Sequence, residues 1–509
     1  WIGNGIMSLG ANKQALMGAA GAGGAGGSGF YSYQIANSAR FDGSASYLNK
    51  TWGSAPSSTT QVALSVWLKK TFTGDVNPVS IFTAVGNTGS FYFNNDDAIA
   101  DNLAYYMGGG GVNGYTTNIR FRDPSAWFHF VAIINSAASN DYDRLKIYIN
   151  GELIALNGGE WTQNAGYPNT STPDAGKNGV ANYIGRYGSA SRYWSGYMAD
   201  FIQIDGAAAI SDFGETKNGV WIPKDPSGLT FGNNGFHLNF ASSGDMGNDV
   251  SGNNNDWTAN SISAHDQMLD SPTFNSDSNG GNFATMNPLS NGSNPVLGEG
   301  NLMMDSFSGS DISGSLANFA LPASSGKWYF ECFINAPNSG DNYPFIGLTA
   351  TTYSQSATMG VSQRDLSINL GTGGSEKNET YVGSITTVFT GVSAYADNTV
   401  CGVFVDMDAR KLWYAKDGAF FNSGNPQTGA NPQYAWTNNV PLLPHFISFS
   451  GYGADSVFNF GQEGTFAGNI TAGGNADVTG YGNFKYDPGD YKALCAGNLP
   501  VADAVDPAQ

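Results

Sequence analysis

Short alternating runs of apolar and polar residues dominate this chain. In the stretch RLKIYINGELI, the side chains of Leu145, Ile147 and Ile149 share one face of an extended strand. Asn150-Gly151 then follow, and this pair readily adopts the positive φ angles of a type I′ turn, so the stretch predicts a β-hairpin. Because a lone hairpin is barely stable, its apolar face also predicts a larger sheet beneath it.

Runs of the same kind recur in both halves of the chain. In the first half they include Val62–Lys70, Ala126–Asn135 and Gly196–Gly206, each bounded by Gly, Asn, Ser or Pro. In the second half they resume at Ser325–Ile334, and KLWYAKDGAFF repeats the hairpin pattern with Asp417-Gly418 at its turn. Short strands joined by tight turns, with little helical periodicity, predict an all-β chain of two antiparallel β-sandwiches.

Stretches of different composition separate the two predicted sandwiches. We assign residues 1–38 to an N-terminal segment, 39–260 to the first sandwich, 261–319 to a polar connector, 320–465 to the second sandwich and 466–509 to a C-terminal extension. The connector is rich in Ser, Asn, Asp and Gly, which favour turns over packed strands. The C-terminal extension carries no clear domain pattern.

The N-terminal segment contains a run of small residues, GAAGAGGAGGSG, that has nothing to bury. Such a run predicts a flexible tether. The alternative is an anchor that threads through a narrow protein groove and becomes ordered there. The glycines that characterise the run are Gly18, Gly21, Gly24 and Gly27.

The amino-acid composition argues against several classes of function. The chain has 509 residues, a net charge of −19 and only 12% charged residues, without a cluster of Lys and Arg, so binding to nucleic-acid phosphates is not expected. Its three cysteines cannot form a disulfide framework, and two of them, Cys332 and Cys401, are predicted core residues because they lie in apolar strand patterns. No run of about 18 apolar residues occurs, so no membrane span is expected.

The first predicted sandwich resembles a concanavalin-like, laminin-G-type jelly roll. The stretches that carry the resemblance are ARFDGSASYLN (39–49), LSVWLKK (64–70), WFHF (127–130), KIYINGELI (146–154) and GYMADFIQIDG (196–206). One feature departs from that family, because GFHLNF followed by DVSGNNNDW resembles the segment that usually opens such a domain but comes last here. Either the sandwich receives its first strand late in the sequence, or a remnant of a second copy is present.

The second predicted sandwich resembles a SPRY domain, a fold that commonly mediates protein recognition. SSGKWYFE (324–331), FIGL, CGVFVDMDARKLWYAKDG (401–418) and VFNFGQ (457–462) occur in the family's order. With the segment from DSPTF to NFATMNPLS (270–290), the whole chain resembles bacteriophage virion proteins that join a laminin-G-like to a SPRY-like module. Such proteins are usually assigned to tail fibres or other exposed structural parts, and the resemblance implies that role here.

Catalysis is not expected from the sequence. Glycoside hydrolases of related fold carry alternate carboxylates on one strand in an E-x-D-x-E pattern, and no such triplet occurs. The four histidines, His129, His237, His265 and His445, lack metal-binding spacing, and neither a G-x-S-x-G motif nor a phosphate-binding loop is found. We therefore predict a binding or structural protein that is not an enzyme.

Residues suited to ligand binding concentrate in GRYGSASRYWSGY, residues 185–197. Aromatic rings and arginines between Gly and Ser suit contact with the apolar faces and the hydroxyl groups of sugars. The candidate ligand-binding residues are Arg186, Tyr187, Arg192, Tyr193, Trp194 and Tyr197. The alternative is that these side chains pack the edge of a sheet or an adjoining subunit.

A calcium site is a second candidate. Asp249, Ser251, Asn253 and Asn255 recur at alternate positions, and oxygen ligands of this kind suit Ca²⁺. The resemblance also implies a rim site, since laminin-G-like modules often hold one Ca²⁺ there. The spacing departs from an EF-hand loop, because Gly comes too early and no bidentate Glu follows. Chance spacing in a turn rich in Asn and Gly is the alternative.

Together these features predict a non-enzymatic virion component of a bacteriophage, made in the host cytoplasm and exposed on the particle. Its N-terminal arm is expected to bind other virion proteins, and its sandwiches to bind a host-surface carbohydrate or receptor. A homo-oligomer is expected, with a trimer favoured. The alternatives are a capsid or tail decoration protein that binds other virion subunits, and a cellular surface adhesin.

Overall fold

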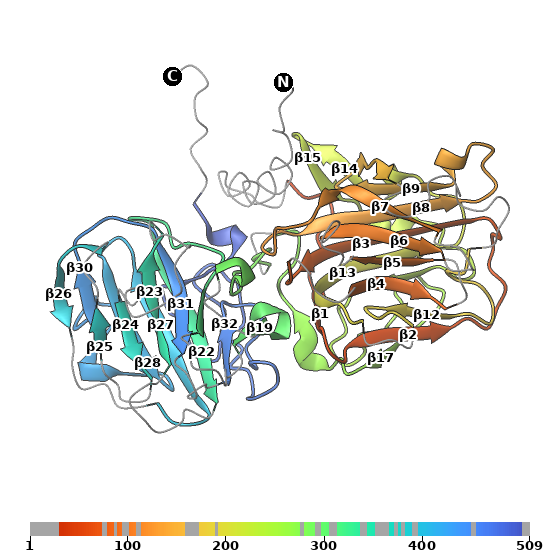
Figure 1. Cartoon of the computed structure of the whole chain (residues 1–509). Coiled ribbons are helices and arrows are strands. Elements are labelled where there is room, and N and C mark those ends of the chain that lie inside the picture. The colour runs from red at the N-terminus through yellow and green to blue at the C-terminus, as the bar shows by residue number, and fades with distance from the viewer. Residues whose placement is uncertain are drawn as a thin grey trace, which may run out of the picture. The chain divides into compact units, whose positions relative to one another are not determined.

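The computed structural model describes residues 30–73, 79–85, 89–93, 101–107, 113–157, 173–188, 192–274, 279–290, 297–304, 313–335, 344–351, 366–370, 375–377, 382–388, 395–448 and 455–500. The chain forms two compact units, one extending to Phe274 and the other beginning at Asn275. Figure 1 shows that each unit consists of layered β-sheets with little helix. The chain is therefore all-β, as the alternating pattern predicts.

The first unit is a sandwich of two antiparallel sheets, each with eight described strands. Sheet A contains, in spatial order, β10 (Glu152–Leu153), β9 (Leu145–Ile149), β8 (Phe128–Asn135), β3 (Gln61–Lys70), β13 (Ser195–Ile204), β1 (Ser38–Asp42) and β18 (Gln267–Met268), with β16 (Phe236–Leu238) also paired to β13. Sheet B contains β11 (Leu156–Asn157), β7 (Asn113–Arg120), β6 (Asn102–Met107), β5 (Ser90–Phe93), β4 (Val79–Ala84), β12 (Ala181–Ile184), β2 (Tyr47–Thr51) and β17 (Thr258–Asn260).

Alternation along these strands buries one face of each sheet in a shared core. Phe41, Leu64 and Phe130 of sheet A belong to the same buried cluster as Ile81 and Phe91 of sheet B. The ring centroids of Phe91 and Phe130 lie 5.2 Å apart across the two sheets. Removing such large apolar side chains from water is the main favourable term in the stability of the sandwich.

The second unit is also built from two sheets. The larger contains β19 (Leu297–Gly298), β20 (Met303–Met304), β32 (Asp455–Asn459), β22 (Lys327–Asn335), β27 (Thr399–Asp406), β28 (Lys411–Lys416), β30 (Tyr434–Trp436) and β26 (Ile385–Val388), with β29 (Ala419–Phe420) beside β28 and β33 (Lys492–Ala493) beside β22. The smaller contains β21 (Ser313–Leu316), β31 (Leu442–Ser448), β23 (Phe345–Ala350), β24 (Leu366–Asn369) and β25 (Ser375–Lys377). The Tyr414 hydroxyl group joins the two sheets, because it lies 3.2 Å from the carbonyl oxygen of Ile346 and 2.9 Å from that of Leu366.

Among the residues that the structure describes, helical structure is limited to single turns. One α-helix and a small hairpin follow β13, and these elements are α2 (Ile210–Phe213), β14 (Gly214–Lys217) and β15 (Val220–Pro223). The described 3₁₀ turns are η2 (Asp141–Asp143), η3 (Pro226–Gly228), η4 (Ala264–Asp266), η5 (Pro288–Ser290), η6 (Glu299–Asn301), η8 (Phe421–Ser423) and η9 (Ala496–Asn498). The scarcity of helix agrees with the near absence of helical periodicity in the sequence.

Both predicted hairpins are confirmed. Asn150 and Gly151 have φ angles of 49° and 80°, as a type I′ turn requires, and they join β9 to β10. Asp417 and Gly418 have φ angles of 47° and 79° and join β28 to β29 in the same way. β9 also pairs with β8, so sheet A is the larger sheet that the first hairpin needs.

Gly151 allows a stability prediction. A methyl group at this residue would lie 2.2 Å from a ring carbon of Trp221, which covers the turn. We expect Gly151→Ala to lower the free energy of unfolding by about 2 kcal/mol, measured by urea denaturation. Gly179→Ala is the matched control, since Gly179 has a similar φ of 74° and no neighbour within 4 Å of the added carbon. Equal losses in the two variants would show that Trp221 does not constrain the turn.

The first unit extends beyond the predicted boundaries at residues 39 and 260. Tyr31 and Ile35 are buried, and the backbone N–H of Ile35 donates to the hydroxyl group of Thr273 over 2.9 Å. β18 pairs with β1, which brings part of the predicted polar connector into sheet A. β16 and β17 also complete the sandwich late in the sequence, by pairing with β13 and β2. This arrangement agrees with the first of the two alternatives for the departure from the laminin-G pattern.

The second unit extends beyond the predicted boundaries at residues 319 and 465. β19 and β20, from the predicted connector, form a hairpin whose second strand pairs with β32. In the predicted C-terminal extension, Phe466, Phe484 and Tyr491 are fully buried, and β33 pairs in parallel with β22. These strands have only two residues each, so they show no alternation that would reveal them in the sequence.

Three other predictions concern single residues and segments. The cysteines Cys332, Cys401 and Cys495 are free and fully buried, which confirms the first two as core residues. No helix in the described residues is long and apolar enough to cross a membrane. The predicted tether lies outside the described residues, with its glycines Gly18, Gly21, Gly24 and Gly27.

Candidate functional site

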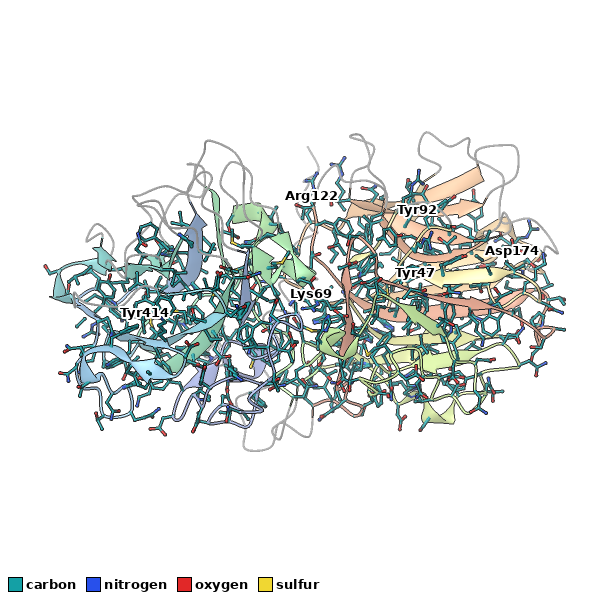
Figure 2. All side chains as sticks on the ribbon, turned by 90° about the horizontal axis from the view of Figure 1, so that it is seen from below. Tyr47, Lys69, Tyr92, Arg122, Asp174 and Tyr414 are labelled. Atoms are coloured by element: carbon teal, nitrogen blue, oxygen red, sulfur yellow. The ribbon has the colours of Figure 1, made fainter. Side chains whose placement is uncertain are left out.

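Three tyrosines lie on the solvent-facing side of sheet B. In β2 and β12, Leu48 and Ile184 point into the core and are fully buried, whereas Tyr47 and Tyr183 occupy the alternate, partly exposed positions. Tyr193 precedes β13 and is partly exposed as well. Figure 2 labels Tyr47 on the first unit.

The three tyrosine rings surround the guanidinium group of Arg186. Its central carbon lies 4.6 Å from the ring centroid of Tyr47 and 5.6 Å from those of Tyr183 and Tyr193. Each cation–π contact of this kind contributes about 0.5–2 kcal/mol and restricts the arginine side chain. Arg186 forms no ion pair with a carboxylate of the described residues. Its positive charge is therefore stabilised by the three tyrosine rings.

A second pair of arginine and tyrosine lies beside this cluster. The guanidinium carbon of Arg192 is 5.0 Å from the ring centroid of Tyr187, and the Tyr187 ring meets Tyr92 edge-on at 6.3 Å. Tyr92 lies between two core residues of β5 and therefore points to the other side of the sheet, where it is covered and only 7% exposed. We call this surface the Tyr–Arg face, and define it as Tyr47, Tyr92, Tyr183, Arg186, Tyr187, Arg192 and Tyr193.

Two of the predicted ligand-binding residues are core residues instead. Trp194 and Tyr197 are both 0% exposed. The Trp194 ring packs at 5.8 Å from Phe72 and 5.9 Å from Phe93, and the Tyr197 ring lies 5.4 Å from the ammonium group of Lys69. For these two residues the packing alternative is correct, because the stretch that contains them passes from a surface turn into the buried strand β13.

Tyr47, Tyr92 and Tyr183 are part of the Tyr–Arg face although the sequence pattern does not single them out. Tyr47 and Tyr183 occupy partly exposed, alternate positions of their strands, whereas Tyr92 lies in β5, whose four residues are all buried. Their proximity depends on strand order, because β12 lies between β2 and β4, and β4 pairs in turn with β5. Strand order within a sheet cannot be read from the alternation of single strands.

The predicted calcium loop has a different geometry. The carboxylate of Asp249 accepts hydrogen bonds from the backbone N–H groups of Ser251 (2.9 Å) and Asn255 (2.8 Å) and from the Ser251 hydroxyl group (2.8 Å). The side-chain amides of Asn253 and Asn255 donate to backbone carbonyl groups of the preceding turn. These four residues therefore close the loop on itself and do not converge as ligands. In the described part of the chain, no group of three His, Cys, Asp or Glu side chains could hold a metal ion.

Two of the strand histidines serve packing. His129 and His445 are buried, and each forms a hydrogen bond with a serine hydroxyl group, at 2.7 Å with Ser65 and 2.8 Å with Ser367. Burial lowers the pKa of His129 to about 3, so its ring is neutral near pH 7. The neutral ring is stacked on Trp67 with 4.6 Å between centroids. His237 has a different environment, which is described below.

Comparisons with known proteins identify no family for this chain. No family model matches it, and neither does any curated protein. Solved structures similar to parts of it include the SPRY domain of human HERC1, with 17% identity over 34% of this chain and 96% of that chain (TM-score 0.26). A putative carbohydrate binding protein from Bacteroides ovatus has 16% identity over 45% of this chain and 60% of that chain (TM-score 0.33). A SAP-like pentraxin from Limulus polyphemus has 16% identity over 35% of this chain and 81% of that chain (TM-score 0.25).

These neighbours are SPRY domains and jelly-roll proteins, which is consistent with two β-sandwiches. Their identities to this chain lie below 25% and their TM-scores below 0.5, so the likeness carries no argument about ligand or activity. None of them concerns a phage particle. The functional conclusion therefore rests on the residues of the Tyr–Arg face.

Proposed function

We propose that the Tyr–Arg face binds carbohydrate and favours acidic saccharides. The observation that carries this proposal is that Arg186 and Arg192 are held on tyrosine rings and pair with no carboxylate of the described residues, although the chain has a net charge of −19. Tyrosine rings offer flat apolar surface to the C–H faces of a sugar. A guanidinium group donates paired hydrogen bonds to a carboxylate or sulfate group.

Two asparagines beside the face add groups that suit sugar hydroxyls. Asn260 lies opposite Tyr47 in the strand register, and Asn49 lies opposite Tyr183. The side-chain nitrogen of Asn260 donates to the side-chain oxygen of Asn49 over 2.7 Å. The remaining donor of Asn49 and acceptor of Asn260 have no partner in the described residues, so they are available to a ligand.

Arg186→Gln is expected to weaken the binding of an acidic polysaccharide about tenfold, because the variant loses the charge but keeps most of the side-chain volume. The measurement is isothermal titration calorimetry of the full chain with polygalacturonate, and with a neutral galactan of similar length as reference. Lys146→Gln is the matched control, since Lys146 is a partly exposed cation of β9 outside the face. Equal losses in the two variants would indicate general charge attraction, and no binding by the unmodified chain would contradict the proposal.

We further propose, from the sequence resemblance, that the chain is a non-enzymatic and exposed component of a bacteriophage particle. It would be made in the host cytoplasm, act as a homo-oligomer with a trimer favoured, and bind other virion proteins through residues 1–38. An acidic polysaccharide of the host surface would then be the ligand. Saturable binding of the full chain to intact host cells, competed by free polysaccharide, would support this role. Absence of such binding would favour a decoration or assembly protein, which is the competing proposal.

A further inference from the structure

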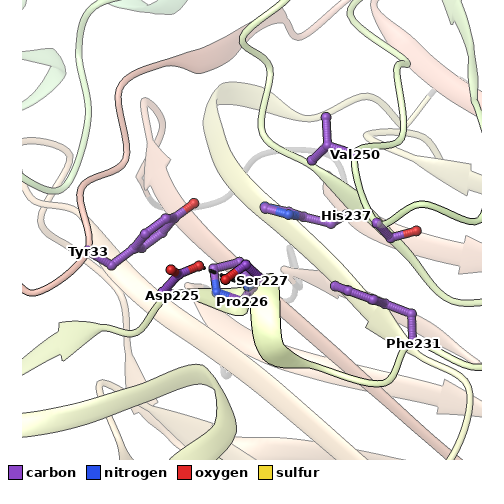
Figure 3. A pocket seen from close by; sticks show the side chains of 8 residues that line it. Tyr33, Asp225, Pro226, Ser227, Phe231, His237 and Val250 are labelled. Atoms are coloured by element: carbon purple, nitrogen blue, oxygen red, sulfur yellow. Dashed lines mark hydrogen bonds between the residues drawn. The ribbon is translucent and has the colours of Figure 1, made fainter.

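A cavity of about 260 Å³ lies in the first unit and shares no residue with the Tyr–Arg face. Figure 3 shows the side chains around it, among them Tyr33, Asp225, Phe231, His237 and Val250. They come from the residues before β1, the turn at η3, the strand β16 and the loop that follows β16. The cavity therefore depends on segments that are distant in sequence.

His237 lines this cavity and has one ring nitrogen without a hydrogen-bond partner in the described residues. Its side chain is only 8% exposed, and its Nε2 is hydrogen-bonded to the carboxylate of Asp200. Asp200 also accepts a hydrogen bond from the hydroxyl group of Tyr33 over 3.1 Å. In the neutral ring, a carboxylate that accepts from Nε2 holds the proton on that nitrogen and leaves a lone pair on Nδ1. Nδ1 has no hydrogen-bond partner in the described residues, and in this tautomer it is an open acceptor.

An irregularity in β13 places Asp200 against His237. The φ angle of Asp200 is 52°, which is the left-handed region and is unusual for a strand residue other than Gly. The register between β13 and β3 shifts between Ala199 and Ile202. A β-bulge of this kind redirects a side chain, and such bulges are frequent beside functional sites.

Asp225 is a second acceptor at the cavity. It is exposed, and its carboxylate accepts a hydrogen bond from the backbone N–H of Ser227 over 2.9 Å. This hydrogen bond lowers the pKa of Asp225, so the group is ionised near pH 7. Burial, and then the negative charges of Asp200 and Asp225, raise the pKa of Tyr33, so its phenol stays protonated. The polar groups at the cavity thus include one open nitrogen acceptor and one exposed anion.

We propose that this cavity binds a protonated primary amine. The Nδ1 atom of His237 and the carboxylate of Asp225 are both acceptors, and an ammonium group is compact and carries only donors. The aromatic rings of Tyr33 and Phe231 favour a cation near their faces. Val250 is 43% exposed and offers an apolar wall to the carbon atoms that carry the amine. The amine belongs either to an amino sugar or to a lysine-like alkylamine.

The test is calorimetric titration of the full chain with two amines and their neutral counterparts. The pairs are glucosamine with N-acetylglucosamine, and 1,5-diaminopentane with 1,5-pentanediol. We expect one of the amines to bind at least about tenfold more tightly than its neutral counterpart, which corresponds to the loss of one charge-assisted contact. The amine that binds identifies the source of the ammonium group. Binding of neither amine, or equal binding of an amine and its counterpart, would overturn the proposal.

Variants at exposed residues locate the binding without disturbing the fold. Asp225→Asn keeps the cap on Ser227 but loses the charge, and we expect about tenfold weaker amine binding. Asp245→Asn is the matched control, because Asp245 is also exposed, accepts a backbone hydrogen bond in its own turn and lies outside the cavity lining. Val250→Lys supplies a competing ammonium group and is expected to abolish binding. Equal weakening by Asp225→Asn and Asp245→Asn would contradict the assignment, as would full binding by Val250→Lys.

The amine site is independent of the proposed carbohydrate site. Arg186→Gln, which removes the central cation of the Tyr–Arg face, is expected to leave amine binding unchanged. Asp225→Asn is expected to leave the binding of polygalacturonate unchanged. Failure of one proposal can therefore be distinguished from failure of the other.

Discussion

Asp270→Ala is expected to lower the free energy of unfolding by about 3–5 kcal/mol. Asp270 and Lys69 form an ion pair of 2.7 Å in which both side chains are 0% exposed. Trp127 donates its indole N–H to the other carboxylate oxygen over 2.8 Å. Burial lowers the pKa of Lys69, and the charge of Asp270 opposes that shift. The variant would leave the buried Lys69, labelled in Figure 2, without its carboxylate. Urea denaturation followed by tryptophan fluorescence measures the loss.

A double variant separates the cost of an unpaired buried charge from the cost of lost side-chain packing. Lys69→Met with Asp270→Leu removes both charges and keeps apolar volume, so it is expected to recover at least half of the loss. Recovery stays partial because the indole N–H of Trp127 still lacks its acceptor. Asp143→Ala is the surface control, since the ion pair of the exposed Asp143 and the partly exposed Lys146 contributes about 0–1 kcal/mol. Equal losses in Asp270→Ala and Asp143→Ala would contradict the prediction.

The free energy of unfolding is also expected to fall as pH rises from about 4.5 to about 7, because of Glu331. Burial raises the pKa of Glu331 from 4.5 to about 7, and hydrogen bonds from Lys485 and Tyr486 limit the rise. Between these two pH values the unfolded chain has released the proton and the folded chain still holds it. Stability therefore decreases with pH in this window and is constant with respect to Glu331 above it. The total change is about 3 kcal/mol.

The hydrogen-bond partners of Glu331 can accommodate both the ionised and the protonated carboxyl group. Its carboxylate accepts hydrogen bonds from the Tyr329 hydroxyl group (2.8 Å), the Asn459 amide (3.2 Å) and the backbone N–H groups of Lys485 (2.9 Å) and Tyr486 (2.8 Å). A protonated Glu331 can instead donate to the phenol oxygen of Tyr329. The same side chain thus attaches residues 485–486 to β22 in either state.

Glu331→Gln tests this prediction. The variant cannot ionise, so its stability is expected to change less between pH 4.5 and 7 than that of the unmodified chain, while two donors lose their acceptor at a cost of about 2–4 kcal/mol. All three cysteines are buried in the second unit, so the rate of thiol labelling in urea reports its unfolding. The same pH dependence in both proteins would exclude Glu331 as the titrating group.

Local features of the fold were predictable from the sequence. The two hairpins depend on adjacent residues, since Asn-Gly and Asp-Gly pairs favour the positive φ angles that Asn150-Gly151 and Asp417-Gly418 adopt. Strands such as β9 also show their alternation, with Leu145, Ile147 and Ile149 buried on one face. The domain boundaries were not predictable, because two-residue strands such as β18 and β33 exist only through pairing with distant strands.

The candidate site likewise has residues that the sequence reveals and residues that only the fold brings together. Arg186, Tyr187, Arg192 and Tyr193 lie in one short stretch, and their chemistry is visible there. Burial excludes Trp194, although it is adjacent to them. The other tyrosines of the face come from three different strands, and their position depends on the order of strands in sheet B.

The amino-acid sequence by itself determined the all-β class, the two sandwiches and the hairpin turns, because these follow from alternation and from the φ preferences of a few residues. Only the tertiary structure decided which side chains meet. Asp200 lies 167 residues from Tyr33 and 37 from His237, yet the three are joined by hydrogen bonds. The physical reason is that strand pairing brings together segments whose separation along the chain carries no local signal.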